Sequence, residues 1–306
     1  MDQAIPVVFC FDANFVNYAA VATFSAFTNS KSKLKVYWLI PSEAESVTEP
    51  IKKLLTDKGV DISIQIASNH HFSEWKEQGH IKKAAYQRLL IPDAVSVPKI
   101  IYLDCDLIVQ TDLGRLFKIE MEKNVVGGAY DPVGEKYSLM PKLNGDKYIN
   151  SGVMILNLEA LRENKFFDRC AEIYNEFTHE VTFCDQCIIN KYSEGKKSLI
   201  DPSWNYCFFI CNNLELSSSE AVTEFEGAKI LHFVGPIKPW SANCPPHLGD
   251  YWWKYAHMLN LPNLERQPYE VPTVVKNKSG IGKRLTDSIN KRILKIKEVA
   301  QRLYGR

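Results

Sequence analysis

Short apolar runs recur along the first part of the chain, and each has the length of a β-strand rather than of a helix. The runs at 5–11 and 34–40 are almost continuously apolar, and the run at 61–66 is rich in isoleucine. Continuous apolar runs of this length are typical of strands that are buried on both faces of a sheet. We therefore expect three strands within the first 66 residues.

The segments between these runs have the spacing of helices. Apolar residues within 16–27 suit a buried helix that Asp12 or Asn14 could cap. Ser42 and Glu45 match a capping box at the start of a second helix. Strands and helices that alternate in this order form right-handed βαβ units. The sequence therefore predicts an α/β fold with a parallel sheet.

The same pattern continues further along the chain. Further strands are expected at 99–103, 125–129, 151–156 and 230–233, and helices at 82–90, 158–178 and 185–190. Pro92 is expected to break the first of these helices. A segment with two prolines, 267–278, separates a body of residues 1–266 from a tail of residues 267–306.

Composition is ordinary for a globular chain, but charge is unevenly distributed. Residues 276–306 hold ten Lys or Arg and two acidic residues, a net charge of +8, whereas the whole chain carries +1. Apolar residues of this tail recur every three or four positions: Ile281, Leu285, Ile289, Ile293, Ile296, Ala300 and Leu303. This pattern predicts a basic amphipathic helix that lies on an anionic membrane surface, with docking to a partner as the alternative. We expect no nucleic-acid partner.

No charged-then-apolar leader precedes the first strand and no apolar run is long enough to span a bilayer, so we expect neither a secretion signal nor a transmembrane helix. Eight scattered cysteines suggest reduced thiols in the cytoplasm. Two spacings, Cys184-x2-Cys187 and Cys207-x3-Cys211, leave open a zinc site. The apolar and aromatic stretch between them is unlike a compact zinc ribbon.

The most informative stretch is Tyr102-Leu103-Asp104-Cys105-Asp106. It follows the predicted strand 99–103, and side chains at i and i+2 return to the same face. Ligands bind at the carboxyl ends of strands in open α/β sheets, and paired carboxylates suit Mg²⁺ or Mn²⁺ holding a diphosphate. The alternative is a pair that only solvates a turn or caps a helix. The glycine-rich dinucleotide fingerprint and the Walker A motif are both absent from the sequence.

Several motifs now stand in a fixed order. They are Phe9–Asn14, Tyr86-Gln87-Arg88-Leu89, Tyr102–Asp106, Asn150-Ser151-Gly152-Val153, Asp185-Gln186 and His232-Phe233-Val234-Gly235-Pro236-Ile237-Lys238-Pro239-Trp240. In these motifs the chain resembles glycosyltransferase family eight, retaining enzymes that include bacterial lipooligosaccharide galactosyltransferases and glycogenin. The resemblance covers about three quarters of the chain. It implies a GT-A-type, single Rossmann-like catalytic domain over residues 1–266.

The resemblance assigns metal coordination to Asp104, Asp106 and His232. It implies Mn²⁺, with Mg²⁺ as the alternative, because imidazole suits Mn²⁺ better. Gly235 would let backbone N–H groups approach the diphosphate, and Lys238 would add a positive charge there. The simpler interpretations are a core histidine and a surface lysine.

The resemblance also implies a nucleotide-sugar site. Asp12 and Asn14 match positions that bind uracil and ribose, Phe15 could stack on the base, and Asp12 could equally be only a helix cap. The full set expected to contact the nucleotide sugar is Asp12, Asn14, Phe15, Arg88, Asp104, Cys105, Asp106, Asn150, Ser151, Gly235 and Lys238. For Arg88 the alternative is a surface arginine paired with Asp93.

Asp131, Asp185 and Gln186 are the expected catalytic residues, because they resemble residues that bond the donor sugar. Asp185 and Gln186 could instead be an N-cap pair, and Asn150 a turn at the start of a strand. Gln186 is a poor nucleophile and Asp185 is a conceivable one, so a covalent intermediate stays open as the alternative. We favour attack by the acceptor from the face that the diphosphate leaves. Retention itself is implied by the resemblance alone.

These observations lead to one expected function. The chain would transfer galactose or glucose from a UDP-sugar to a lipopolysaccharide or other surface glycan, as a peripheral protein on the cytoplasmic face of a bacterial inner membrane. The alternatives are self-glucosylation or protein glycosylation as in glycogenin, a metal-dependent nucleotidyltransferase, and a non-catalytic membrane-associated scaffold.

Overall fold

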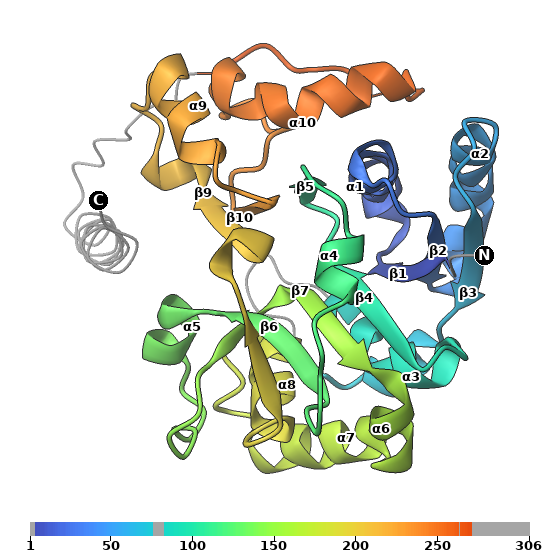
Figure 1. The fold of residues 1–306 in the computed structure, drawn as a ribbon, viewed down its shortest axis with the longest axis vertical. Coiled ribbons are helices and arrows are strands. Elements are labelled where there is room, and N and C mark those ends of the chain that lie inside the picture. Colours follow the sequence, from blue (N-terminus) through green and yellow to red (C-terminus); the bar gives the residue numbers. More distant parts are fainter. Residues whose placement is uncertain (1–3, 76–82, 263, 271–306) are drawn as a thin grey trace.

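The computed structural model describes residues 4–75, 83–262 and 264–270 (Figure 1). The predicted basic amphipathic helix at 276–306 lies outside these described residues, and that expectation stays a prediction. None of the described helices is both long and apolar enough to span a bilayer.

A seven-stranded sheet forms the centre of the molecule, in the order β3-β2-β1-β4-β7-β6-β8. Its strands are β1 (Ile5–Cys10), β2 (Leu34–Ile40), β3 (Ile62–Ile66), β4 (Lys99–Leu103), β6 (Val126–Tyr130), β7 (Ile149–Asn157) and β8 (Lys197–Ile200). The first four strands in this order are parallel, whereas β7 runs antiparallel to both β4 and β6. The expected α/β fold with a mostly parallel sheet is therefore confirmed.

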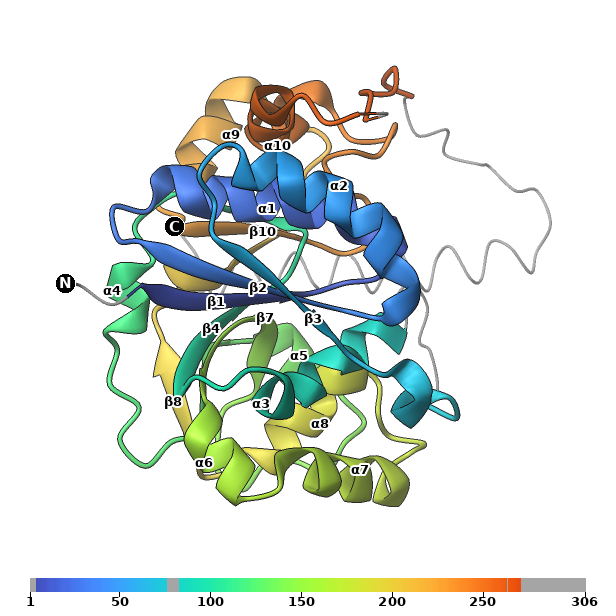
Figure 2. The ribbon, with the colours of Figure 1, turned by 90° about the vertical axis from the view of Figure 1, so that its right-hand side faces the viewer.

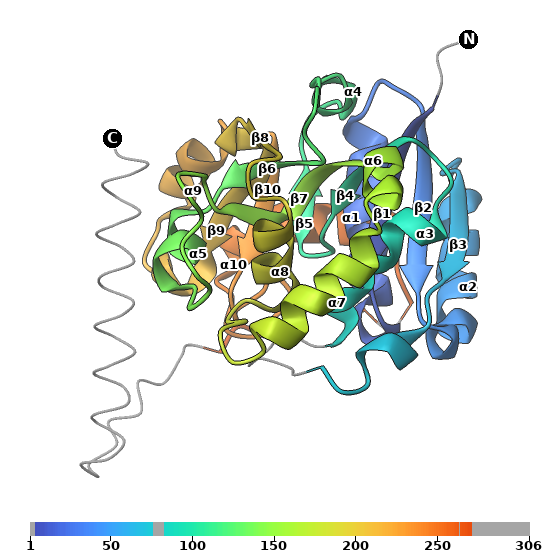
Figure 3. The same cartoon turned by 90° about the horizontal axis from the view of Figure 1, so that it is seen from below.

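Helices cover both faces of this sheet (Figures 2 and 3). On one face lie α1 (Val16–Asn29) and α2 (Glu45–Thr56), with α10 (Pro246–Leu259) packed against α1 on the side away from the sheet. On the other face lie α3 (Ile91–Ala94), α6 (Leu158–Glu163), α7 (Phe166–Glu176) and α8 (Cys184–Tyr192). Val7 and Phe9 of β1 pack into the core of the first face and Val8 into the core of the second. Burial on both faces explains why the strand sequences are continuously apolar.

A second, three-stranded sheet lies beyond the carboxyl end of β4. It contains β5 (Leu107–Val109), β10 (Ile230–Val234) and β9 (Tyr206–Phe209) in that order. β10 runs antiparallel to β5 and parallel to β9, so that His232 lies opposite both Leu107 and Cys207. Only β10 was expected from the sequence, because β5 and β9 are too short to show a periodic pattern. The remaining helices are α4 (Gly114–Phe117), α5 (Pro132–Tyr137) and α9 (Ser218–Phe225).

Three helix predictions were wrong in detail. The capping box at Ser42 does not form, because Ser42–Ala44 is a 3₁₀ turn and α2 begins at Glu45 without a side-chain cap. Pro92 does not end a helix, because the 3₁₀ segment Lys83–Leu90 continues directly into α3. Pro92 lies in the first turn of α3, where the backbone N–H that proline lacks would have no partner within the helix. The long helix expected at 158–178 divides at Lys165, whose φ of 48° is left-handed.

Candidate active site

An open cavity of about 1350 Å³ lies at one edge of the large sheet. The carboxyl ends of β1, β4 and β6 and the amino end of β7 meet there, because β7 is antiparallel to its neighbours. Every site residue expected from the sequence lines this cavity except Asn14. Asn14 donates its backbone N–H to Asp12 Oδ1 at 2.9 Å, so the capping role weighed for Asp12 is present alongside its place in the cavity.

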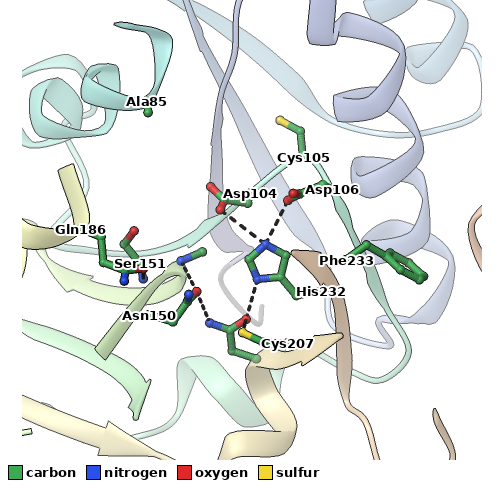
Figure 4. Close-up of polar contacts among 12 residues, drawn as sticks. Ala85, Asp104, Cys105, Asp106, Asn150, Ser151, Gln186, Cys207, His232 and Phe233 are labelled. Atoms are coloured by element: carbon green, nitrogen blue, oxygen red, sulfur yellow. Dashed lines mark hydrogen bonds and ion pairs between the residues drawn. The ribbon is translucent and has the colours of Figure 1, made fainter. Parts of the chain in front are cut away.

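Asp104, Asp106 and His232 bring their ligand atoms within 4.8 Å of one another (Figure 4). His232 Nε2 lies 3.0 Å from Asp106 Oδ1 and 3.6 Å from Asp104 Oδ2. Two carboxylate oxygens and one imidazole nitrogen form a donor set that fits Mn²⁺ or Mg²⁺. The simpler interpretations, in which Asp104 and Asp106 only solvate a turn and His232 is a core histidine, do not account for this convergence.

The cysteines do not form the alternative metal site in the part of the chain that the structure describes. Cys187 Sγ is 3.2 Å from the Tyr148 hydroxyl and 3.4 Å from Ser138 Oγ, well inside the protein. Cys184 is buried, and neither it, Cys187 nor Cys207 belongs to a group of three ligands. The zinc interpretation therefore has no support among the described side chains.

Positive charge already faces the acidic pair. Lys238 Nζ lies 2.5 Å from Asp106 Oδ2 and donates to the Phe233 carbonyl at 2.8 Å. Burial of Asp106 disfavours its charge, but Lys238 and His232 outweigh that effect and hold its pKa well below the usual range. Burial likewise opposes the charge of His232, but Asp106 raises the pKa of that imidazole to about 10. Lys238 is thus not a free surface lysine.

Arg88 connects Asp104 to Asp185 and Ser151 within the cavity. It is only 8% exposed. Its guanidinium pairs with Asp104 at 3.0 Å and Asp185 at 3.2 Å, and donates to the carbonyl and hydroxyl oxygens of Ser151, each at 3.1 Å. The alternative of a surface arginine paired with Asp93 is therefore wrong.

Asp185 lies in the first turn of α8 and is buried. Burial raises the pKa of Asp185 to about 6, although the Arg88 charge opposes this rise. The N-cap of α8 is Phe183, so the alternative in which Asp185 and Gln186 form an N-cap pair is wrong. Asp185 also accepts a hydrogen bond of 3.1 Å from Ser151 Oγ.

Asp131, Asn150 and Gln186 converge on the opposite wall of the cavity. Asp131 Oδ1 caps α5 by accepting from the Gly134 N–H at 2.7 Å. Its Oδ2 accepts from Gln186 Nε2 at 3.1 Å and from Asn150 Nδ2 at 3.4 Å. Asn150 lies within β7 rather than in a turn. These amide and carboxylate groups can bond the hydroxyls of a sugar.

Phe15, Gly235 and Cys105 also line the cavity. Phe15 is 38% exposed and meets Tyr18 edge to face, with ring centroids 5.4 Å apart. Gly235 has φ of +87°, a conformation that favours glycine. Cys105 is buried, and its thiol points to the Cys10 carbonyl at 3.8 Å, so it offers the cavity little more than its backbone.

Gly152 and Asn205 also belong to this site, although neither was expected to from the sequence. Gly152 lies so close to His232 that a Cβ built on it would be 2.2 Å from His232 Cε1. Asn205 is 4% exposed, and its Oδ1 lies 2.8 Å from His232 Nδ1. Gly152 belongs to the motif Asn150-Ser151-Gly152-Val153, whereas nothing in the sequence around Asn205 distinguishes it from an ordinary polar residue.

Comparison with known proteins agrees with this geometry. The chain is 26% identical over 267 residues to general stress protein A of Bacillus subtilis, which covers 83% of this chain and 93% of that protein. It is 23% identical to a putative glycosyltransferase of Haemophilus influenzae, over 94% of this chain and 89% of that protein.

Among solved structures, galactosyltransferase LgtC in complex with donor and acceptor sugar analogues superposes with a TM-score of 0.71 and 22% identity, covering 84% of this chain and 97% of that one. Glycosyltransferase GlyE of Streptococcus pneumoniae gives a TM-score of 0.62 at 22% identity, over 85% of this chain and 63% of that one. These likenesses establish a shared fold. The family model of glycosyl transferase family 8 matches residues 6–244, most of the chain, and the protein therefore belongs to glycosyltransferase family 8.

Proposed function

We propose that this glycosyltransferase moves galactose or glucose from a UDP-sugar to a hydroxyl of a lipopolysaccharide or other surface glycan, with retention and with Mn²⁺ bound. The observation that carries the proposal is the convergence of Asp104, Asp106 and His232 opposite sugar-bonding side chains in one cavity. The likeness to LgtC, solved with donor and acceptor sugar analogues, supports a sugar donor and a sugar acceptor.

The metal would be held by two carboxylates and one imidazole. A divalent cation in that place supplies positive charge to the diphosphate that departs from the sugar. Lys238, whose Nζ lies 2.5 Å from Asp106 Oδ2, would pair with the phosphate oxygens in place of Asp106. Gly235, with its left-handed backbone, lets the chain approach the diphosphate without a side chain in the way.

Asp131, Asn150 and Gln186 would orient the donor sugar. Asp185 is bound by both Arg88 and Ser151, which reduces its freedom to act as a nucleophile. The amide of Gln186 is a poor nucleophile. Both observations support attack by the acceptor hydroxyl from the face that the diphosphate leaves, which retains the configuration of the anomeric carbon. Asp12 and Phe15, which line the cavity, would receive the uridine, whereas Asn14 lies outside the cavity lining.

The proposal is tested by incubating the protein with a panel of UDP-sugars and measuring UDP release with and without Mn²⁺. We expect one UDP-hexose to be hydrolysed in a metal-dependent manner, and Asp106→Asn to lower the rate roughly 100-fold or more, since a direct ligand is lost. Release of UMP would indicate a nucleotidyltransferase. A mass increase of the intact protein would indicate self-glucosylation, and no turnover of any UDP-sugar would contradict the proposal.

For the tail we propose attachment to the cytoplasmic face of a bacterial inner membrane. The support is its net charge of +8 over residues 276–306 and its apolar repeat. Truncation after Gln267 should leave UDP-sugar hydrolysis near the wild-type rate and weaken both transfer to a lipid acceptor and sedimentation with anionic vesicles. Equal sedimentation of the truncated and full-length proteins would contradict this proposal and favour a protein partner for the tail.

A further inference from the structure

A chain of side-chain amides joins the metal-binding histidine to the sugar-facing wall of the cavity (Figure 4). His232 Nδ1 lies 2.8 Å from Asn205 Oδ1, and Asn205 Nδ2 lies 2.8 Å from Asn150 Oδ1. Asn150 Nδ2 in turn reaches Asp131 Oδ2 at 3.4 Å. The two ends of this chain are the residues to which the proposed function assigns metal and sugar.

One backbone group determines the direction of every hydrogen bond in this series of side chains. The N–H of Gly152 donates to the Asn150 side chain at 2.9 Å, so the atom that receives it is an oxygen. That oxygen also faces Asn205, which must therefore present its NH₂ group. The other amide atom of Asn205 is then its oxygen, and it faces His232 Nδ1. An oxygen there accepts only from a protonated Nδ1.

We infer that Asn205 is a positioning residue that holds His232 in the tautomer with a proton on Nδ1 and the lone pair of Nε2 directed to the metal, while its NH₂ group fixes the orientation of Asn150 toward the sugar. The inference rests on the proposed metal site. Histidine ligands of metals commonly donate their other N–H to a fixed acceptor, which sets the ring orientation and raises the ligand's basicity. Nε2 is the nitrogen that faces Asp104 and Asp106 here.

The local structure makes Asn205 rigid enough for this role. It ends a 3₁₀ turn, Pro202–Asn205, whose start is capped by Asp201 through the Ser203 N–H at 3.0 Å. The next residues form β9, and the β9–β10 register places Cys207 beside His232. Asn205 directly precedes β9, and its Oδ1 lies 2.8 Å from His232 Nδ1.

Only an amide can make both bonds. An aspartate at position 205 could accept from Nδ1 but would place an oxygen against Asn150 Oδ1, which is held by the Gly152 N–H. An alanine would lose both bonds. The two functions of Asn205 can therefore be separated by substitution.

The experiment compares Mn²⁺ binding by calorimetry and the KM for the UDP-sugar that the wild type uses, in three full-length variants. Asn205→Ala should weaken Mn²⁺ binding on the order of 10–100-fold. Asn205→Asp should restore Mn²⁺ binding to within a few-fold of wild type but keep the KM for the donor raised, about tenfold for the lost bond to Asn150. Asn150→Ala, the comparison variant, should raise the KM and weaken Mn²⁺ binding less than Asn205→Ala does, because Asn205 Oδ1 still faces His232 Nδ1.

A tautomer measurement on the wild-type protein tests the inference even if Asn205→Ala does not fold. In the protein loaded with diamagnetic Cd²⁺, ¹⁵N spectra should show His232 with a protonated Nδ1 and a metal-bound Nε2. A proton on Nε2 instead, or wild-type Mn²⁺ affinity in a folded Asn205→Ala variant, would overturn the inference. Failure of the wild type to bind Mn²⁺ at all would instead overturn the metal site of the proposed function.

Discussion

Replacing Gly152 by alanine should abolish binding at the proposed metal site while leaving the fold intact. Gly152 lies in β7, and its carbonyl accepts from the Asp104 N–H at 2.8 Å. A Cβ at this position would be 2.2 Å from His232 Cε1 and 2.8 Å from both His232 Nδ1 and Asp104 Oδ2. The substitution therefore crowds two of the three proposed ligands at once.

The size of the effect follows from these distances. Ordinary contact begins near 3.4 Å, so the imidazole must retreat by about 1.2 Å from its present 2.2 Å. Metal–ligand distances tolerate changes of only about 0.2 Å. His232 would then be lost as a ligand, and we expect Mn²⁺ affinity and turnover to fall by roughly 100-fold or more, beyond the loss typical of a changed supporting residue.

The assay is calorimetric titration of Mn²⁺ into Gly152→Ala, with circular dichroism to establish that the variant is folded. Gly127→Ala is the matched control, because Gly127 lies in the adjacent strand and the nearest contacts of its Cβ would be the flexible Met121 sulfur at 3.3 Å and Ile155 at 3.5 Å. The control should bind Mn²⁺ as the wild type does. A folded Gly152→Ala variant with Mn²⁺ affinity within threefold (roughly 0.7 kcal/mol) of wild type would refute the reasoning.

Three further outcomes are expected. Lys238→Met removes the cation that pairs with Asp106, so Mn²⁺ alone should bind at least as tightly as in the wild type, while calorimetry with Mn²⁺ present shows UDP affinity lowered about tenfold or more. Arg88→Met leaves the carboxylates of Asp104 and Asp185 without their buried partner and should lower the free energy of unfolding by about 3–5 kcal/mol in urea denaturation. Because burial raises the pKa of Asp185 to about 6, its contribution to stability is present below pH 4 and is lost as pH rises through 6. The free energy of unfolding of Asp185→Asn, minus that of the wild type, should therefore rise by up to about 3 kcal/mol between pH 4 and 7. A difference that stays constant over this pH range in urea denaturation would contradict the prediction.

The successes and errors of the sequence predictions have separable causes. The strands β1, β2 and β4 were predictable because burial on both faces requires continuous apolar residues. The errors at Ser42 and Pro92 arose from helix starts, where a 3₁₀ turn takes the place that a local signature assigns to an α-helix. The short strands β5 and β9 have three and four residues, too few for a periodic signal.

The ion-pair partners of Arg88 could not be identified from its sequence motif. The sequence placed an arginine near a strand end, with Asp93 as a plausible surface partner. The structure instead buries it between Asp104 and Asp185, which come from β4 and α8. A buried arginine needs charged partners from elsewhere in the fold, and local sequence cannot name them.

The sequence by itself determined the α/β alternation, the strand that ends in Asp104 and Asp106, and the return of these two side chains to one face, since each depends on residues only a few positions apart. Tertiary structure decided which distant groups complete the site. His232 meets the two aspartates because β10 pairs with β5, which begins directly after Asp106. Asn205 reaches His232 because β9 pairs with β10 in one particular register. Register is a property of two strands packed together, so no local pattern in either strand contains it.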